Sequence, residues 1–220
     1  MSRDSDAKPI LVLIKFRVQG ILRFISHAEM LKVFQRACAR AGIEIQHSQG
    51  FNPHPKLSLP LPRPVGIESD DELLCIRMNG NLNESQIKTM LSAQLPEGCE
   101  LLSVNFAQTA KSVQPCAVTY IVPVRPECIN DKLRVRVENL LASESLVMER
   151  RIDTKKSKIK MLDVRPFLES IKFDNKSIVV GCRVTPAGSV RIGEILELLE
   201  IGVEELAAPV KRTNLQWQAA

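Results

Sequence analysis

The sequence predicts an α+β protein made of two ferredoxin-like halves, each of the βαββαβ type, packed side by side. Three observations predict this class. Strand-like and helix-like segments alternate in the order β-α-β-loop-β-α-β over residues 1–107. A similar order recurs over residues 118–220, and residues 108–117 between them have the composition of a linker. The chain of 220 residues is 45% hydrophobic and 25% charged, which is enough for a sizeable core without disulfides or metals.

The elements of the first half follow from turn and capping signals. Residues 10–18 are rich in aliphatic side chains and predict a strand, which ends at the turn Gln19-Gly20. Ser26 and Glu29 have the spacing of a capping box, so a helix begins there and ends near Ala41. A short strand over 43–46 leads into a stretch over 48–66 whose five prolines exclude a helix or a central strand. We then expect a strand over 73–78, a helix over 84–94 and a strand over 101–106.

The second half is predicted to have a similar order of strands and helices. A strand over 118–124, a helix over 130–141 and a strand over 146–152 are expected first. Pro166 suits the first turn of a helix, so residues 163–171 are predicted to form a short one. A strand over 177–184, a helix over 192–201 and a strand over 210–217 complete the half.

Several classes of protein are disfavoured by composition. The longest aliphatic run, residues 10–14, is too short for a membrane span, so we expect no membrane association. No apolar signal region precedes this run, so we expect a cytoplasmic location. The six cysteines form no CxxC pair, and the closest two are twelve residues apart, so no zinc, iron–sulfur or dithiol site is expected. Neither GxxxxGK[ST] nor GxGxxG is present. We therefore predict no cofactor and no metal, and His27, His47 and His54 lack the spacing for a site on one helix face.

The charge is uneven along the chain. The net charge is +5, and residues 1–64 carry ten Lys or Arg against four Asp or Glu. Residues 150–165 carry seven bases against two acids, whereas residues 66–104 and 192–206 are acidic. This pattern is typical of a side that faces a polyanion, and also of ordinary variation on a solvated surface.

The first helix separates its charges from its apolar side chains. At 100° per residue, Met30, Phe34 and Cys38 lie on one face, with His27 among them at the helix start as a packed or cap-supporting residue. The opposite face carries a stripe of three bases at i, i+4 and i+8: Lys32, Arg36 and Arg40. Such a stripe could follow a phosphate backbone, or it could be a solvated face.

The segment 48–56, Ser-Gln-Gly-Phe-Asn-Pro-His-Pro-Lys, is the least ordinary in the chain. Its glycine allows a positive φ, and each of the two X-Pro steps favours an extended backbone. A rigid loop of this kind would present side chains with little entropy left to lose on binding. The candidate binding residues are Ser48, Gly50, Phe51, Asn52, His54 and Lys56. A merely structural proline loop is the alternative.

A second polar segment, residues 185–191, joins a predicted strand to a predicted helix. It places Gly188, Ser189 and Arg191 at the helix N-terminus, where free amides, the helix dipole and an arginine could hold a phosphate. Capping of the helix by Ser189 explains the same residues.

These segments resemble the radical SAM-linked protein family, a domain of unknown function known as DUF2344. The resemblance rests on the runs GILRFISH (20–27), RACARAG (36–42), SQGFNPHPK (48–56), PLP (60–62), PVG (64–66), DVRP (163–166), VTPAGS (184–189) and KRT (211–213). Ala28-Glu29 departs from the Leu-Asp pair that the family usually has after the histidine. The resemblance implies a domain fused to, or encoded beside, a radical SAM protein, which would be its partner. The chain lacks the three-cysteine cluster of that enzyme, so its implied role is to bind or present the partner's substrate.

Three functions remain open at this point. The leading expectation is a non-catalytic accessory domain that presents RNA to a radical SAM enzyme, with RNA inferred from charge alone. Lys32, Arg36, Arg40, Lys56 and Arg191 would contact phosphates, while Asn52 and His54 would position the substrate. The second is a metal-independent RNA-processing enzyme, with His54 as general acid/base and Lys56 or Arg36 stabilising the developing charge. The third is a protein–protein adaptor whose basic faces are simply solvated.

Overall fold

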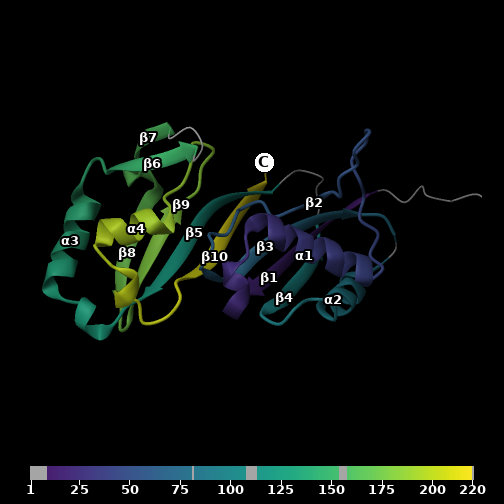
Figure 1. Cartoon of the computed structure of the whole chain (residues 1–220), viewed down its shortest axis with the longest axis horizontal. Helices are drawn as coiled ribbons and strands as arrows, with labels where there is room; N and C mark the ends of the chain where they lie inside the picture. Colours follow the sequence, from purple (N-terminus) through teal and green to yellow (C-terminus); the bar gives the residue numbers. More distant parts are fainter. Residues whose placement is uncertain (1–8, 81, 108–112, 154–157, 220) are drawn as a thin grey trace, which may run out of the picture. The chain divides into compact units, whose positions relative to one another are not determined.

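The computed structural model describes residues 9–80, 82–107, 113–153 and 158–219, and it has the predicted mixed α+β class (Figure 1). The chain divides into two compact units, which we call unit 1 and unit 2. Unit 1 comprises residues 1–114 and 218–220, and unit 2 comprises residues 115–217.

Unit 1 has the element order β-α-β-β-α-β. Its elements are β1 (Ile10–Val18), the 3-10 turn η1 (Gly20–Phe24), α1 (His27–Arg40), β2 (Leu57–Ser58), β3 (Glu68–Met78), α2 (Glu84–Ser92) and β4 (Cys99–Phe106). The sheet order is β4-β1-β3-β2, and each neighbouring pair is antiparallel. Alternate side chains of β1 and β3 are buried in one core cluster with the apolar faces of α1 and α2. Within it the rings of Phe16 and Phe34 meet edge to face, with centroids 4.7 Å apart.

Unit 2 repeats this order with an insertion. It contains β5 (Val113–Pro123), η2 (Pro126–Cys128), α3 (Asp131–Ala142), β6 (Val147–Asp153), β7 (Lys158–Asp163), η3 (Arg165–Phe167), β8 (Leu168–Asp174), β9 (Ser177–Arg183), α4 (Ile192–Leu199), η4 (Val203–Glu205) and β10 (Lys211–Ala219). Within unit 2, four strands are hydrogen-bonded neighbours in the order β10-β5-β9-β8, while β6 and β7 form a separate two-stranded sheet. We call this pair the β6–β7 ribbon.

The predicted helix over 163–171 is wrong. Pro166 starts only the single turn of η3, after which β8 pairs with β9. The buried Leu168 and Ile171 lie on either side of a register shift in the pairing of β8 with β9, and this pairing favours a strand over a helix. Strand β7 was not predicted either.

The predicted linker overlaps a strand. Residues 113–117 lie in β5, and the boundary between the two units falls between residues 114 and 115. Residues 108–112 lie outside the described part of the chain.

Candidate nucleic-acid interface

Residues 46–56 form a hydrogen-bonded hairpin beside the end of β3, which we call the 46–56 hairpin (Figure 1). The Ser48 amide donates to the His54 carbonyl at 2.8 Å, and the Lys56 amide donates to the Gln46 carbonyl at 2.6 Å. Arg77 of β3 anchors both arms, since its carbonyl accepts from the Gln46 amide at 2.8 Å and its amide donates to the Lys56 carbonyl at 2.9 Å. The extended backbone predicted from the prolines therefore continues the hydrogen bonding of β3.

The tip of the hairpin leaves its side chains in solvent. Phe51 is fully exposed, at 110% of the reference area, and Asn52, His54 and Lys56 are exposed as well. Ser48 differs, because its hydroxyl oxygen accepts from the His54 amide at 2.9 Å and so helps to close the hairpin. Gly50 has φ +125°, a conformation that other residues rarely adopt. The structure thus brings the six predicted hairpin residues together, four of them as exposed side chains.

Helix α1 begins with the predicted capping box. The Glu29 amide donates to the Ser26 hydroxyl at 3.3 Å, and the Ser26 amide donates to the Glu29 carboxylate at 2.7 Å. The hydrogen bond from the Ser26 hydroxyl is the main reason that the pKa of Glu29 is lowered, with the Ser26 amide adding to it.

The basic stripe on α1 is only partly available. Lys32, Arg36 and Arg40 are all exposed. Arg40, however, donates through Nε and Nη2 to the side chain and carbonyl of Gln94, at 3.2 and 2.6 Å. Within the described residues, Lys32 and Arg36 have no hydrogen bond or ion pair, and α1 contacts β2 next to the 46–56 hairpin.

Much of the basic excess of unit 1 has a structural role instead. Lys15 pairs with Asp71, and Arg17 pairs with Asp70 and Glu100, each at 3.0 Å. The guanidinium group of Arg63 donates to carbonyls of Leu22, Arg23, Ile25, Pro64 and Ile67, which ties η1 to the proline-rich segment. Nothing in the sequence pattern had singled out Arg63, because these acceptors belong to two separate segments.

His27 lines a small cavity together with this arginine. It is half-buried, and its Nδ1 atom is buried without a hydrogen-bond partner. Together with Ser26, Arg63 and Glu72 it lines a cavity of about 10 Å³. This volume suits a single water molecule, so the position fits a structural role. Across the described residues, no three His, Cys, Asp or Glu side chains gather as they would around a metal ion.

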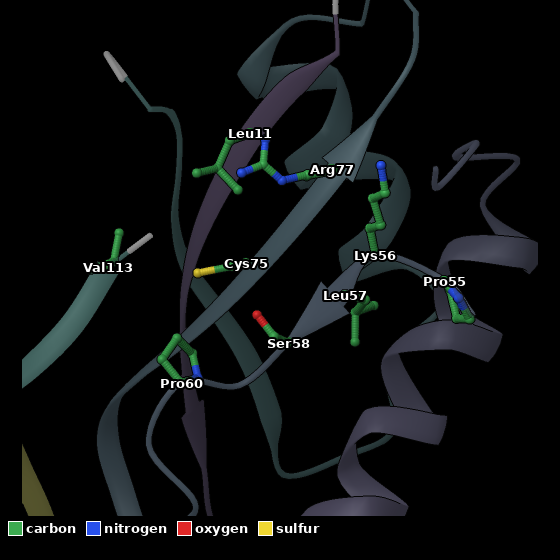
Figure 2. A pocket seen from close by; sticks show the side chains of 9 residues that line it. All are labelled: Leu11, Pro55, Lys56, Leu57, Ser58, Pro60, Cys75, Arg77 and Val113. Carbon is green, nitrogen blue, oxygen red and sulfur yellow. The ribbon is translucent and has the colours of Figure 1, made fainter. Parts of the chain in front are cut away.

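A larger cleft of about 350 Å³ opens beside the base of the hairpin, within unit 1. Figure 2 shows the side chains that line it: Leu11, Pro55, Lys56, Leu57, Ser58, Pro60, Cys75, Arg77 and Val113. Arg77 and Cys75 alternate along β3 with the buried Ile76 and Met78, so they face away from the core cluster. Burial raises the pKa of the Cys75 thiol to about 11, against the opposing effects of Ser58 and Arg77. Of these polar residues, only Lys56 was predicted from the sequence.

The second predicted site belongs to unit 2. Thr185 and Gly188 exchange backbone hydrogen bonds at 2.9 and 3.0 Å, which closes a tight turn. Helix α4 then begins at Ile192 with Arg191 as its N-cap, so Ser189 is not the capping residue.

The backbone amides of Gly188 and Arg191, which would receive a phosphate there, already have partners. The carboxylate of Glu194 accepts from the Arg191 amide at 2.7 Å, and it pairs with Arg150 at 2.7 Å. Arg150 also donates to the Ser189 carbonyl at 2.9 Å. The side chain of Arg191 is exposed. These contacts hold the turn against the β6–β7 ribbon. The Glu194 carboxylate therefore lies at the helix N-terminus, where the sequence predicted a phosphate.

In the basic segment 150–165, some basic side chains form structural hydrogen bonds and others are exposed. Arg165 donates to the carbonyls of Leu141, Ser143 and Leu168 at 2.7, 2.9 and 2.8 Å, so it holds the chain around η3. Arg151 and Lys160 are exposed on the ribbon. Lys155 and Lys156 lie outside the described residues.

Comparison with known proteins gives a family and no activity. Residues 12–202 match a family described as "Uncharacterized protein conserved in bacteria (DUF2344)". No curated protein matches the chain. No helix in the described ranges combines the length and apolarity that crossing a bilayer requires.

Two solved structures are similar over nearly the whole length of both chains. One is the acetolactate synthase small subunit from Thermotoga maritima, at 10% identity and a TM-score of 0.26, covering 97% of this chain and 98% of that one. The other is an unknown protein from Galdieria sulphuraria, at 12% identity and a TM-score of 0.27, covering 96% and 100%.

Proposed function

We propose that this chain, which belongs to the DUF2344 family, is a non-catalytic module that binds single-stranded RNA and presents it to a radical SAM enzyme. The observation that supports RNA binding best is the 46–56 hairpin, whose two arms are held by backbone hydrogen bonds while Phe51, Asn52, His54 and Lys56 remain in solvent. We also propose that each unit is a ferredoxin-like domain, because the observed strand orders β4-β1-β3-β2 and β10-β5-β9-β8 correspond to each other.

The exposed groups match the chemistry of single-stranded RNA. An aromatic ring such as Phe51 can stack on an unpaired base, and the amide of Asn52 can hydrogen-bond a base edge. Lys56, with Lys32 and Arg36 on the neighbouring helix, can contact successive phosphates. The stacking term is worth about 1–3 kcal/mol per base, so Phe51 is expected to dominate the affinity of the tip.

The partnership with a radical SAM enzyme is supported by the family resemblance of the motifs quoted above. A second function, RNA processing by His54, has no comparable support. The imidazole of His54 is exposed, and within the described residues no hydrogen bond orients it as a general base requires.

Fluorescence anisotropy with an unstructured oligoribonucleotide tests RNA binding. Phe51→Ala should weaken binding about tenfold or more, which corresponds to the lower part of the stacking range. Arg36→Glu should weaken binding and reduce the slope of log affinity against log salt by about 0.7 or more, the single-strand value for one phosphate.

Lys172→Glu is the matched control for charge, because Lys172 is exposed on β8 of unit 2 and belongs to neither the hairpin nor α1. Its affinity should stay close to that of the parent chain apart from a small long-range effect. Equal affinity of Phe51→Ala, Arg36→Glu and the parent would exclude the proposed interface. Co-purification of the chain with its radical SAM partner, with and without RNase treatment, then separates RNA presentation from a pure adaptor role.

A further inference from the structure

The tip of the 46–56 hairpin is carried on a hydrogen-bonded ladder. The Ser48 amide donates to the His54 carbonyl at 2.8 Å, and the His54 amide donates to the Ser48 hydroxyl at 2.9 Å. His47 and Pro55 form the next bridge towards the sheet. Residues 49–53, beyond this ladder, are all exposed, and Figure 1 shows the hairpin projecting from unit 1 as a narrow loop ahead of β2. The side chains of the tip therefore have a supported backbone beneath them.

Phe51 lies in the middle of this tip, with an exposed fraction of 110%, so its ring is accessible to a partner. It follows Gln46, which is bound to β3, by five positions. At about 3.3 Å per residue the tip can thus project by about 16 Å at most. The hairpin contains no Asp or Glu that would repel a phosphate chain. A rigid projection that ends in an apolar side chain is the form of the wedges that some proteins insert between bases.

The aromatic side chains of unit 1 suit one insertion better than stacking along a strand. Proteins that bind single strands without sequence preference stack successive bases on aromatic side chains. Among the described residues of unit 1, the exposed aromatic side chains are Phe24 and Phe51. The Arg23 guanidinium group covers one face of the Phe24 ring, at 4.3 Å from its centroid. Unit 1 therefore offers bases a single protruding ring rather than a row of them.

The cost of opening a base stack narrows the class of RNA. A ring can enter a stack only where two neighbours separate, and this costs least beside a base that is already unpaired. If Phe51 takes the position of a bulged base, the base pairs on both sides keep a stacked neighbour. A fully paired stem offers no such position. The exposed cations Lys56, Lys32 and Arg36 would contact the phosphates on either side of the bulge.

We propose that the 46–56 hairpin is a wedge: Phe51 takes the place of a bulged base in an RNA stem, and that base is turned out of the stack. The inference rests on the proposed function, because it names the kind of RNA that the same hairpin binds. Asn52, next to the ring, has an amide that can donate to and accept from the edge of a flanking base. An enzyme that modifies a base needs it outside the stack, so extrusion is the way in which the module would present its substrate.

An RNA stem with 2-aminopurine as its bulged nucleotide tests extrusion by the full chain. This base fluoresces weakly while it is stacked and strongly once it leaves the stack. Protein added until the anisotropy is saturated should raise the fluorescence about twofold or more, because the base leaves its neighbours. Phe51→Ala should bind more weakly and give no rise at saturation. Phe51→Leu should keep most of the rise, since leucine also serves as a wedge.

Phe24→Ala is the matched control, because it removes the other exposed aromatic ring of unit 1 and should leave the fluorescence rise unchanged. A second measurement compares the bulged stem with a fully paired stem of the same length. The parent chain should prefer the bulged stem about tenfold, which corresponds to the lower part of the stacking range for one base. Phe51→Ala should lose this preference, because its remaining contacts are to phosphates that both stems share.

The outcomes separate the wedge from the proposed function. Binding of the bulged stem by the parent chain without a rise in fluorescence would refute the wedge and leave RNA binding standing. An equal rise with Phe51→Ala, or equal affinity of the parent chain for the two stems, would refute the wedge as well. Absence of binding to bulged, paired and unstructured RNA alike would refute both proposals. If Phe51→Ala kept its RNA affinity but no longer co-purified with the radical SAM partner after RNase treatment, the tip would be a protein contact and the wedge would be refuted.

Discussion

The 46–56 hairpin and the turn at 185–189 are both short polar segments that contain a glycine, yet their polar groups differ in exposure and in hydrogen-bond partners. In the hairpin, backbone groups of the two arms pair with each other and with β3, and the side chains at the tip are exposed to solvent. At the turn, the Ser189 carbonyl and the Arg191 amide are held by the half-buried Arg150 and the buried Glu194. The first segment can meet a ligand without unfolding anything, while the second fastens the ribbon to α4.

The difference teaches that a glycine- and proline-rich pattern predicts the turn but not its use. Whether the turn can bind a ligand depends on whether a side chain distant in sequence forms hydrogen bonds with its backbone groups. Arg150 and Glu194 are 44 residues apart in sequence, so no local signal reports their meeting.

Glu194→Ala should have the largest effect and tests whether the turn is structural. It leaves the half-buried Arg150 guanidinium without its carboxylate and removes the acceptor of the Arg191 amide. We expect the free energy of unfolding to fall by about 3–5 kcal/mol, measured by urea denaturation. The double variant Arg150→Met with Glu194→Leu should recover part of that loss. A single variant as stable as the parent would show that the buried pair contributes nothing.

Replacing the glycine of each segment with alanine compares how much conformational strain the two segments tolerate. Gly188 has φ +142° and Gly50 has φ +125°, so both substitutions force a non-glycine residue into a costly conformation. Gly188→Ala should cost about 1–3 kcal/mol, because the turn is clamped by the Thr185 bonds and cannot relax. Gly50→Ala should cost less, since nothing lies within 4 Å of the added methyl and the tip can adjust. Thermal melting of both variants measures the contrast, and equal losses would contradict it.

Acid should weaken the attachment of the ribbon in unit 2. The Asp163 carboxylate accepts from the amides of Leu146 and Arg165 at 2.8 and 3.0 Å, and these bonds hold its pKa below the ordinary value. Because the folded pKa is the lower one, the stabilisation is present above the unfolded pKa near 3.9 and is lost as pH falls through the folded value.

Asp163→Asn should therefore flatten the dependence of stability on pH below about pH 4, the range set by the unfolded pKa. Glu144→Gln, which removes an exposed carboxylate two residues before Leu146, serves as the charge-matched control. Unfolding midpoints measured between neutral and acid pH make the comparison. Parallel profiles for the parent and Asp163→Asn would show that these hydrogen bonds have no influence on stability.

The smallest effect on stability is expected at the hairpin tip. Phe51→Ala and Asn52→Ala should change the free energy of unfolding by no more than about 0.5 kcal/mol, because exposed side chains without contacts contribute little. The same substitutions should still impair RNA binding in the anisotropy assay. A marked loss of stability in either variant would mean that the tip packs against the chain in solution, and the contrast between the two segments would disappear.

Local signals predicted a large part of the fold. The capping box of Ser26 and Glu29, the strand over 10–18 and the helices over 84–94 and 130–141 are confirmed, with ends shifted by a few residues. The errors lie where tertiary pairing overrides the local preference. Pro166 does start a turn, but the segment after it becomes β8 because β9 offers it a partner. Strand β7 is stabilised by its pairing with β6, and the basic residues around it suggested only a charged surface.

For the candidate site, the sequence identified the hairpin and the α1 stripe but not the cleft. Lys56 was singled out as a loop residue, whereas Arg77 looked like an ordinary strand residue and Ser58 like one more residue of the proline-rich stretch. Only the register between β2 and β3 brings the three together. The same limit applies to Arg40 and Arg63, which were counted as positive charge although they serve as hydrogen-bond donors to distant carbonyls and Gln94.

In unit 2 the first strand along the chain, β5, lies beside the last, β10, so their pairing joins residues near 115 to residues near 215. Closing so long a loop costs entropy before any contact repays it, and such non-local pairing is slow. During synthesis, β5 leaves the ribosome with one hydrogen-bonding edge unpaired until the final strand emerges. An unpaired edge of this kind can recruit other strands, so nascent unit 2 passes through an interval in which chaperone binding and aggregation compete with folding.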